Sequence, residues 1–160
     1  MKSNSEVKQL MDATDLHIMR CLKENARMSA SEISTRVSMS VSAVIERIKK
    51  MEQSGIIKQY TIVVDHKKTG NDVIAFVTIS LEHPSYHDKF IEAINKNNQV
   101  NECHYMTGDL DFILKIITNS IDMLAEHLNE IKSIVGVSLT RTMVVLSTPK
   151  DDFTVIPESL

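Results

Sequence analysis

The segment from Ser38 to Gly55, SMSVSAVIERIKKMEQSG, begins with small hydroxyl side chains and carries cationic side chains further along. Apolar residues recur through it at Val44, Ile48 and Met51, which is the spacing of a helix with one buried face. Serines at the start of such a helix leave backbone N–H groups open to a phosphate oxygen, and a guanidinium can donate two hydrogen bonds to guanine. The chemistry that this segment predicts is contact with double-helical DNA.

The polar side of this helix supplies the candidate DNA contacts. They are the capping residue Ser40, followed by Ser42, Ala43, Glu46, Arg47 and Lys50. We expect Arg47 to have no partner within the protein and to pair with guanine, Glu46 to accept from cytosine, and Lys50 to contact phosphate. The alternative interpretation is an ordinary solvated helix face behind a capping serine. The elements that precede the helix favour DNA contact.

Two further helices are predicted before this one. Asp12 and Asp15 give a cap signal for the first, and Ser29 and Glu32 give a capping box for the second. Only about three residues then separate the second helix from the helix that begins after Ser40. Two helices joined by so short a turn, the second with an exposed polar face, are typical of a helix-turn-helix unit.

Beyond Gly55 the pattern changes from helical periodicity to strands. Residues 56–65 are rich in β-branched side chains and predict a strand, and a polar linker follows them. From about residue 72 the patterns predict strand, helix, strand, strand, helix, strand, which is the ferredoxin-like βαββαβ arrangement. Both faces of the first of these strands are apolar, so we expect a second subunit to cover the face that the helices leave open.

Composition and charge are consistent with a protein of this kind. The net charge is −3, but residues 1–70 hold 12 Lys and Arg against 8 Asp and Glu, whereas residues 71–160 hold 6 against 13. Such a division is expected when one part of the chain meets a polyanion. No apolar run approaches the roughly twenty residues that span a bilayer, and the first residues lack a signal core, so we expect a cytoplasmic protein with no membrane partner. We expect Cys21 and Cys103 to be buried, reduced thiols.

Catalytic, metal-binding and cofactor-binding patterns are weak. His83 and His87 have the spacing of a helical metal pair, but Pro84 and Ser85 between them suggest a loop entering a helix that Ser85 caps. No Gly-rich phosphate loop, CxxC pair or nucleophile elbow is present in the sequence. We expect no catalytic residues, no metal site and no cofactor.

In order and spacing, four segments resemble the Lrp/AsnC family of prokaryotic transcription regulators, the leucine-responsive or feast/famine proteins. The segments are DATDLHIMRCLKENARMSASEIS, SVSAVIERIKKMEQSGIIKQYTIVVD, VNECHYMTGDLDFILKI and GVSLTRTMVVL, and the resemblance covers about residues 12–148. It implies an α+β fold with an N-terminal three-helix helix-turn-helix domain and a hinge strand over residues 1–65. A C-terminal ferredoxin-like domain for effector binding and oligomerisation follows at 72–148, and a tail at 149–160. Family members form homodimers, often assembled into tetramers or octamers, and many bind a small amino acid between dimers.

The resemblance also assigns positions. The family's DNA-facing residues correspond to Arg27, Ser29, Ser40, Ser42, Ala43 and Arg47, and its effector site to Gly108, Asp109, Asp111, Thr140 and Thr142. The chain departs from the family pattern at Ser38, where glycine is usual, and at Val41, where proline is frequent. Serine reaches a positive φ at modest cost, and the first helical position does not require proline.

The TGDLD segment has a physical logic of its own. Gly108 and Asp109 suit a tight hairpin whose backbone is open to a close ligand. Asp109 and Asp111 could hold an α-ammonium group, while backbone N–H groups receive the carboxylate. The alternative is a common hairpin turn without a ligand.

Two other classes of function compete with DNA-binding regulation. Siroheme decarboxylases are built on similar domains and would be enzymes that use histidine or arginine near a tetrapyrrole, for which His104 and Arg141 are the available residues. A regulatory module that binds amino acids without DNA is the other, and the complete helix-turn-helix pattern argues against it.

Overall fold

The computed structural model describes residues 11–159, in two compact units. Within these residues, the helical unit comprises 11–62 together with the C-terminal segment 150–159, and the sheet unit runs from Val63 to Pro149. No described helix is both long and apolar enough to cross a bilayer.

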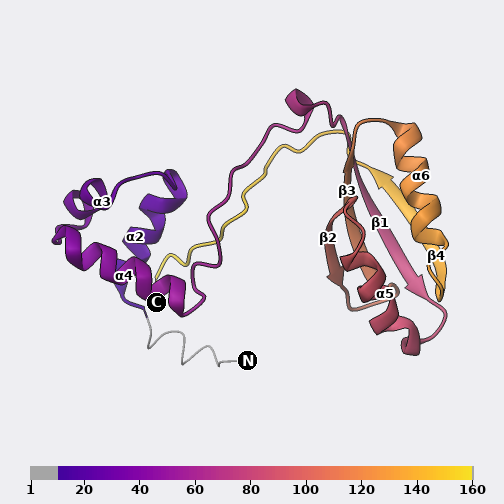
Figure 1. The fold of residues 1–160 in the computed structure, drawn as a ribbon, viewed down its shortest axis with the longest axis horizontal. Helices are drawn as coiled ribbons and strands as arrows, with labels where there is room; N and C mark the ends of the chain where they lie inside the picture. The colour runs from indigo at the N-terminus through magenta and orange to yellow at the C-terminus, as the bar shows by residue number, and fades with distance from the viewer. Residues whose placement is uncertain (1–10, 160) are drawn as a thin grey trace. The chain divides into compact units, whose positions relative to one another are not determined.

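Three helices form the body of the helical unit: α2 (Ala13–Glu24), α3 (Ala30–Val37) and α4 (Val41–Gln53). Figure 1 shows them as the three helices near the N-terminal end of the colour scale. Their shared core contains the buried side chains Ile18, Cys21, Met28, Ile33, Val44 and Met51. Because each helix is amphipathic and contributes to this core, the three pack into one small hydrophobic cluster.

Local capping signals decide where these helices begin, as the sequence predicts. Asp12 caps α2 and forms a capping box with Asp15, and Ser29 caps α3 with Glu32 in the same arrangement. Ser40 caps α4 by accepting a hydrogen bond from the backbone N–H of Ala43 at 3.2 Å. Each cap satisfies donors that the first turn of a helix leaves without partners.

The turn between α3 and α4 contains the departure from the family pattern at Ser38. Ser38 has φ 54° and ψ 46°, the left-handed conformation that usually favours glycine. Among the described residues it is the only non-glycine with a positive φ. Serine therefore supports the three-residue turn that sets α4 against α3.

The prediction of a strand at residues 56–65 is wrong for the single chain, because these residues join no β-ladder. Ile62 and Val63 are 83% and 67% exposed. A β-branched segment becomes a strand only when another strand satisfies its backbone, and the described residues of this chain provide none here.

The sheet unit confirms the predicted βαββαβ order. Its elements are β1 (Val73–Leu81), α5 (His87–Asn95), β2 (Val100–Tyr105), β3 (Phe112–Thr118), α6 (Ile121–Lys132) and β4 (Val137–Val144), with short 3-10 turns η1 (Lys67–Thr69) and η2 (Pro84–Tyr86). The strands form an antiparallel sheet in the order β2-β3-β1-β4, and both helices lie beside it in Figure 1. This is the ferredoxin-like fold.

Both helices cover the same face of the sheet. Their buried side chains Phe90, Ile94, Leu124 and Ile131 share one cluster with Ala75, Val77 and Ile79 of β1 and with Phe112, Leu114 and Ile116 of β3. Since alternate residues of a strand point to opposite faces, the residues between them face the other way. That open face is defined here by Ile74, Phe76, Ile113, Ile117, Leu139 and Met143.

Two local expectations in this unit are wrong. Ser85 does not cap α5: it lies in η2, where the Nδ1 atom of His83 accepts the Ser85 backbone N–H at 3.1 Å. Pro84 fixes the backbone before Ser85, so the helix begins only at His87. Cys103 lies exposed on the edge strand β2, whereas Cys21 is buried as expected.

Candidate functional site

The outward side of α4 is solvent-exposed at most of the predicted DNA-contacting positions. Ser42, Glu46 and Lys50 are exposed, and Ala43 is half-buried. Within residues 11–159 neither Glu46 nor Lys50 forms an ion pair. These side chains are therefore available to a ligand that approaches the helix from solvent.

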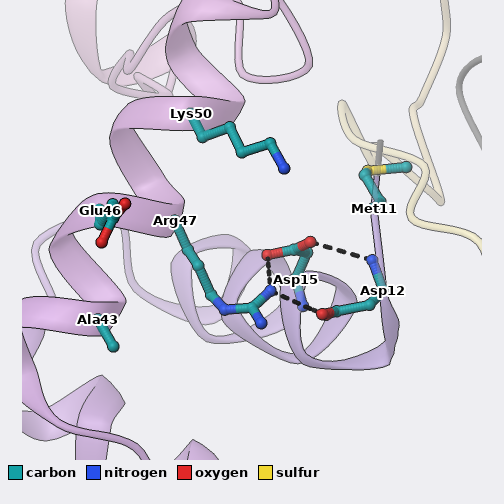
Figure 2. A pocket seen from close by; sticks show the side chains of 7 residues that line it. All are labelled: Met11, Asp12, Asp15, Ala43, Glu46, Arg47 and Lys50. Atoms are coloured by element: carbon teal, nitrogen blue, oxygen red, sulfur yellow. Dashed lines mark hydrogen bonds and ion pairs between the residues drawn. The ribbon is translucent and has the colours of Figure 1, made fainter. Parts of the chain in front are cut away.

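Arg47 differs from the expectation, because it has partners within the protein. Its Nη1 atom donates to Oδ2 of Asp12 and to Oδ1 of Asp15, each at 2.8 Å. Figure 2 shows the guanidinium reaching from α4 to these two carboxylates at the start of α2. The prediction that Arg47 has no partner is wrong, since sequence spacing does not show that α2 brings two carboxylates opposite α4.

The electrostatics of this contact favour the charged state of its groups. The hydrogen bond to Asp15 and, to a smaller extent, the hydrogen bond to Asp12 raise the pKa of Arg47 above its ordinary value. The backbone N–H of Asp15 and, more weakly, the guanidinium of Arg47 lower the pKa of Asp12. The cap of α2 and the ion pair with α4 thus depend on the same two carboxylates.

A hollow of about 400 Å³ lies beside this ion pair, between the first turn of α2 and one flank of α4. Its lining residues are Met11, Asp12, Asp15, Ala43, Glu46, Arg47 and Lys50, all drawn in Figure 2. Cationic and anionic groups lie within it side by side, and the guanidinium is already neutralised. The hollow therefore presents no concentrated charge of one sign.

The face of α4 that is exposed lies further from α2 than the DNA-contacting face that the sequence predicts. Ala43 and Arg47 on the α2 side are half-buried, whereas Ile45 and Lys49 on the other side are exposed. Ile45 is 41% exposed, and an aliphatic side chain can contact a thymine methyl group. Sequence reasoning missed Ile45, although its place outside the Val44, Ile48, Met51 spacing was a signal for it.

The other predicted DNA-contacting residues lie at helix starts. Ser40 and Ser42 are exposed at the start of α4, and their Oγ atoms lie 3.1 Å apart. At the start of α3, Ser29 is engaged with Glu32 through its hydroxyl at 2.7 Å, and Arg27 is exposed two residues earlier. A helix start favours an anion through its open N–H groups, so both places suit phosphate.

The C-terminal segment belongs to the helical unit and contacts α2. Lys23 pairs with Asp152 at 2.8 Å, and Arg20 donates to the backbone oxygens of Pro157 and Glu158 at 3.1 and 2.8 Å. Sequence reasoning treated residues 149–160 only as a tail. Contacts between residues more than a hundred positions apart leave no periodic signal in a sequence.

The predicted effector loop joins β2 and β3. Gly108 has φ 114°, so the turn depends on a backbone conformation that glycine adopts readily. Asp111 has a structural partner, because its Oδ2 accepts the backbone N–H of Leu81 at 2.7 Å where the β1–β4 pairing is irregular. Asp109 is exposed and forms no ion pair within the described residues.

The two threonines of the predicted effector site lie on another strand. Thr140 of β4 is opposite Ile79 of β1, and Ile79 is opposite Phe112, the first residue of β3 after the loop. Thr142 follows on the same face of β4, opposite Val77. The loop and the threonines are therefore separated by β1, at about 10 Å between alternate strands.

Two other groups of candidates do not form a site. His104 lies on β2 and Arg141 on β4, which are the opposite edges of the sheet, so they do not gather around one ligand. Among the residues described, no cluster of His, Cys, Asp and Glu has the geometry to hold a metal ion.

Comparisons with known families agree with this architecture. Residues 11–58 match the family described as winged helix-turn-helix DNA-binding, and residues 74–155 match the Lrp/AsnC ligand binding domain. Transcriptional regulator AzlB of Bacillus subtilis is 36% identical over 148 residues, which cover 88% of this chain and 92% of AzlB.

Solved structures share the fold over most of the chain. The structure of AsnC from E. coli has a TM-score of 0.86 at 31% identity and covers 92% of this chain and 99% of its own. A transcriptional regulator of Neisseria meningitidis, solved as a complex with L-Met, has a TM-score of 0.86 at 26% identity, over 91% of this chain and 96% of its own. A helix-turn-helix unit followed by a ferredoxin-like ligand-binding domain defines a DNA-binding transcription regulator. The chain belongs to the Lrp/AsnC family of these regulators, which confirms the resemblance inferred from the sequence motifs.

Proposed function

We propose that the chain binds double-stranded DNA through the start and the outer face of α4. The observation that carries this proposal is a capped, solvent-exposed helix set behind a three-residue turn, with Lys49 and Lys50 outward. Ser40 and Ser42 contact phosphate at the start of α4, and Arg27 and Ser29 do so at the start of α3. Glu46 meets base edges beside the half-buried Ala43, and Lys50 contacts the backbone.

Isolation of the fragments that the protein binds from sheared genomic DNA tests this proposal directly. The full chain should enrich a small set of fragments that share a partly palindromic site, since a dimer presents two copies of α4. Equal recovery of all fragments would contradict sequence-specific binding. Repeating the selection with each amino acid tests whether an effector changes which sites are bound.

We propose further that the turn between β2 and β3 binds a small amino acid. Asp109 is exposed at the tip and offers its carboxylate to an α-ammonium group, while Asp111 holds the loop through Leu81. Gly108 leaves the backbone open, and Thr140 and Thr142 add hydroxyl groups from β4, where a second dimer completes the site. The L-Met complex of the N. meningitidis regulator supports an amino acid as the class of ligand.

Calorimetric titration with a panel of amino acids tests the effector proposal. At least one amino acid should bind, and Asp109→Ala should weaken its binding by about tenfold or more, because a charge-assisted hydrogen bond is lost. Asp72→Ala changes an exposed aspartate just before β1 and is the matched control, which should bind like the parent. Absence of binding across the panel would remove the effector from the account.

We propose that homodimers form through the open face of the sheet and assemble into tetramers or octamers. Leu139 and Met143 on this face are 50% and 52% exposed in the single chain, and an apolar face of this kind is covered most simply by a second copy. The extended, β-branched residues 56–65 provide a further surface for pairing between copies. Sedimentation should give a dimer or a larger species for the parent and a smaller species for Met143→Asp; identical masses would contradict this interface.

We propose that the protein is not an enzyme and acts in the cytoplasm, where its DNA lies. The relatives described above are transcription regulators, and His104 and Arg141 are on opposite sheet edges. Incubation with siroheme should leave the absorbance of the tetrapyrrole unchanged.

A further inference from the structure

We propose that Arg47 positions α4 by tethering it to the first turn of α2, and acts on DNA binding through Asp12 and Asp15 rather than by contacting a base. This inference rests on the proposed DNA-binding function and assigns a role to one residue within it. It replaces the expected pairing of Arg47 with guanine.

Each carboxylate in the tether has one oxygen for α2 and one for Arg47. Oδ1 of Asp12 accepts the backbone N–H groups of Thr14 and Asp15 at 2.8 and 2.9 Å, while its Oδ2 accepts from Arg47. Oδ2 of Asp15 accepts the backbone N–H of Asp12 at 3.0 Å, while its Oδ1 accepts from Arg47. All four carboxylate oxygens therefore have donors, and the cap of α2 is continuous with the tether to α4.

Burial makes the tether hard to release. The side chain of Asp15 is only 8% exposed and that of Arg47 is 29% exposed. If the guanidinium moved to a base, Asp15 would remain as a charge with little access to water and no cationic partner, which is costly. The cost at Asp12 would be smaller, because its side chain is 52% exposed and water can solvate the charge. The energetic cost of releasing Arg47 therefore arises mainly at Asp15.

The position of Arg47 on α4 agrees with a tether. Arg47 and Ala43 lie on the flank that faces α2, whereas Ser42, Ile45 and Lys49 lie on the exposed face. Val44 and Met51 anchor a different side of α4 in the core. A helix held from two sides has a defined orientation, so its serines and lysines meet phosphates at fixed places.

Four forms of the full chain test the proposal: the parent, Asp15→Asn, Arg47→Met and the double variant. The DNA is a duplex enriched by the parent in the genomic selection, together with its single-base variants. Circular dichroism gives the folded fraction, and affinities are compared for folded protein only. The affinity of the folded protein is the readout that a contribution to stability alone would not change, and the base preference at each position separates a tether from a direct base contact.

A positioning role predicts similar losses of affinity, of about tenfold, for the two single variants. The double variant should bind like either single variant, because both remove the same contact. The order of base preference should stay the same at every position. Arg47→Lys, which keeps the charge and can reach one carboxylate, should recover part of the affinity, and it replaces Arg47→Met if that variant does not fold.

Three results would overturn the tether. The first is a loss of preference at one base pair in Arg47→Met that Asp15→Asn does not share, since this identifies a direct base contact. The second is unchanged affinity in either single variant, and the third is a double variant whose loss is the product of the two. A parent that selects no sequence would instead end the proposed DNA-binding function, so the two failures are distinguishable.

Discussion

The helical unit and the sheet unit differ in what holds them together. Among the described residues, six buried side chains form the cluster that holds α2, α3 and α4, whereas ten form the cluster between the sheet and its helices. The helical unit adds two capping boxes, the Arg47 tether and the contact between Lys23 and Asp152. The sheet unit also has ion pairs, such as Lys115 with Glu102 at 2.8 Å, but they join neighbouring strands or nearby residues, whereas the Arg47 tether joins two helices of the unit with the smaller core.

The exposed surfaces of the two units differ in charge. The exposed side of α4 carries Lys49 and Lys50, whereas the open face of the sheet carries Phe76 and Met143. Charged groups suit a polyanion, and an apolar face suits a second protein chain. The two units therefore expose surfaces suited to different kinds of contact: salt screens contacts made by the charged side of α4, whereas contacts made by the apolar face of the sheet depend on shape and packing.

The largest effect is expected for a steric change in the sheet unit. Gly136 has φ 93°, and a Cβ atom there would overlap the side chain of Tyr86. Gly136→Ala should lower the free energy of unfolding by about 3 kcal/mol, because it adds backbone strain to a clash in a packed region. Gly70→Ala is the matched control: φ is 82°, nothing lies near its Cβ, and only about 1 kcal/mol should be lost. Chemical denaturation measures both, and equal losses would show that the contact with Tyr86 is unimportant.

Removing a surface cation should weaken DNA binding when the cation lies on α4 of the helical unit, but not when it lies on the sheet unit. Lys50→Ala should weaken binding to every duplex by a similar factor of about three to ten and lower the salt slope by about 1, because one phosphate contact is lost. Lys89→Ala makes the same chemical change on α5 of the sheet unit and should leave both quantities unchanged. Titrations at several salt concentrations measure the slopes, and equal behaviour of the two variants would contradict the assignment of DNA contact to α4.

Acid should affect the helical unit through Asp12. Its pKa is lowered in the folded protein, chiefly by the Asp15 backbone N–H and also by Arg47, so its contribution to stability is present above its ordinary pKa. This contribution is lost as the pH falls below the ordinary pKa of aspartate and through the lower folded pKa. Asp12→Asn retains a capping side chain but does not titrate, so its stability should fall less steeply over this range than that of the parent. Denaturation at several pH values measures the difference; parallel curves would exclude Asp12 as a contributor.

The smallest effect is expected where the C-terminal segment meets α2. Lys23 lowers the pKa of Asp152, but both side chains are well exposed, so solvent screens the pair. Asp152→Asn should lower the midpoint of thermal unfolding by less than about 2 °C, and high salt should abolish the difference. Asp151→Asn, at the neighbouring exposed position, is the control and should match the parent. A large shift would show that the segment stabilises the helical unit more than its surface contacts indicate.

Sequence patterns predicted those features that depend on near neighbours in the chain. The capping boxes at Asp12 and Ser29 each need only one partner, three positions later in the chain. The βαββαβ order follows from segments whose hydrophobic periodicity alternates between 2 and 3.6 residues. The cap expected at Ser85 failed, because Pro84 and His83 create a 3-10 turn that a capping pattern does not reveal. The strand predicted at 56–65 did not form, because no described residue of this chain pairs with it and periodicity does not show whether a pairing strand exists.

The candidate site was less predictable than the fold. Periodicity assigned the buried side of α4 correctly at Val44 and Met51, but it could not show that Arg47 meets carboxylates 35 and 32 residues earlier in the chain. It also passed over Ile45, whose exposure depends on how α2 and α3 pack against α4. A helical pattern gives the direction of a side chain from its own axis, whereas its partners are decided by tertiary packing.

Hydrogen–deuterium exchange of the full chain, with and without a duplex enriched by the selection, tests the central claim most directly. If α4 binds DNA, exchange in residues 40–53 should slow when the duplex is added, and exchange in the β1 and β3 strands at the centre of the sheet should not change. Protection confined to the sheet unit, with residues 40–53 unchanged, would contradict the claim that α4 is the DNA-binding element.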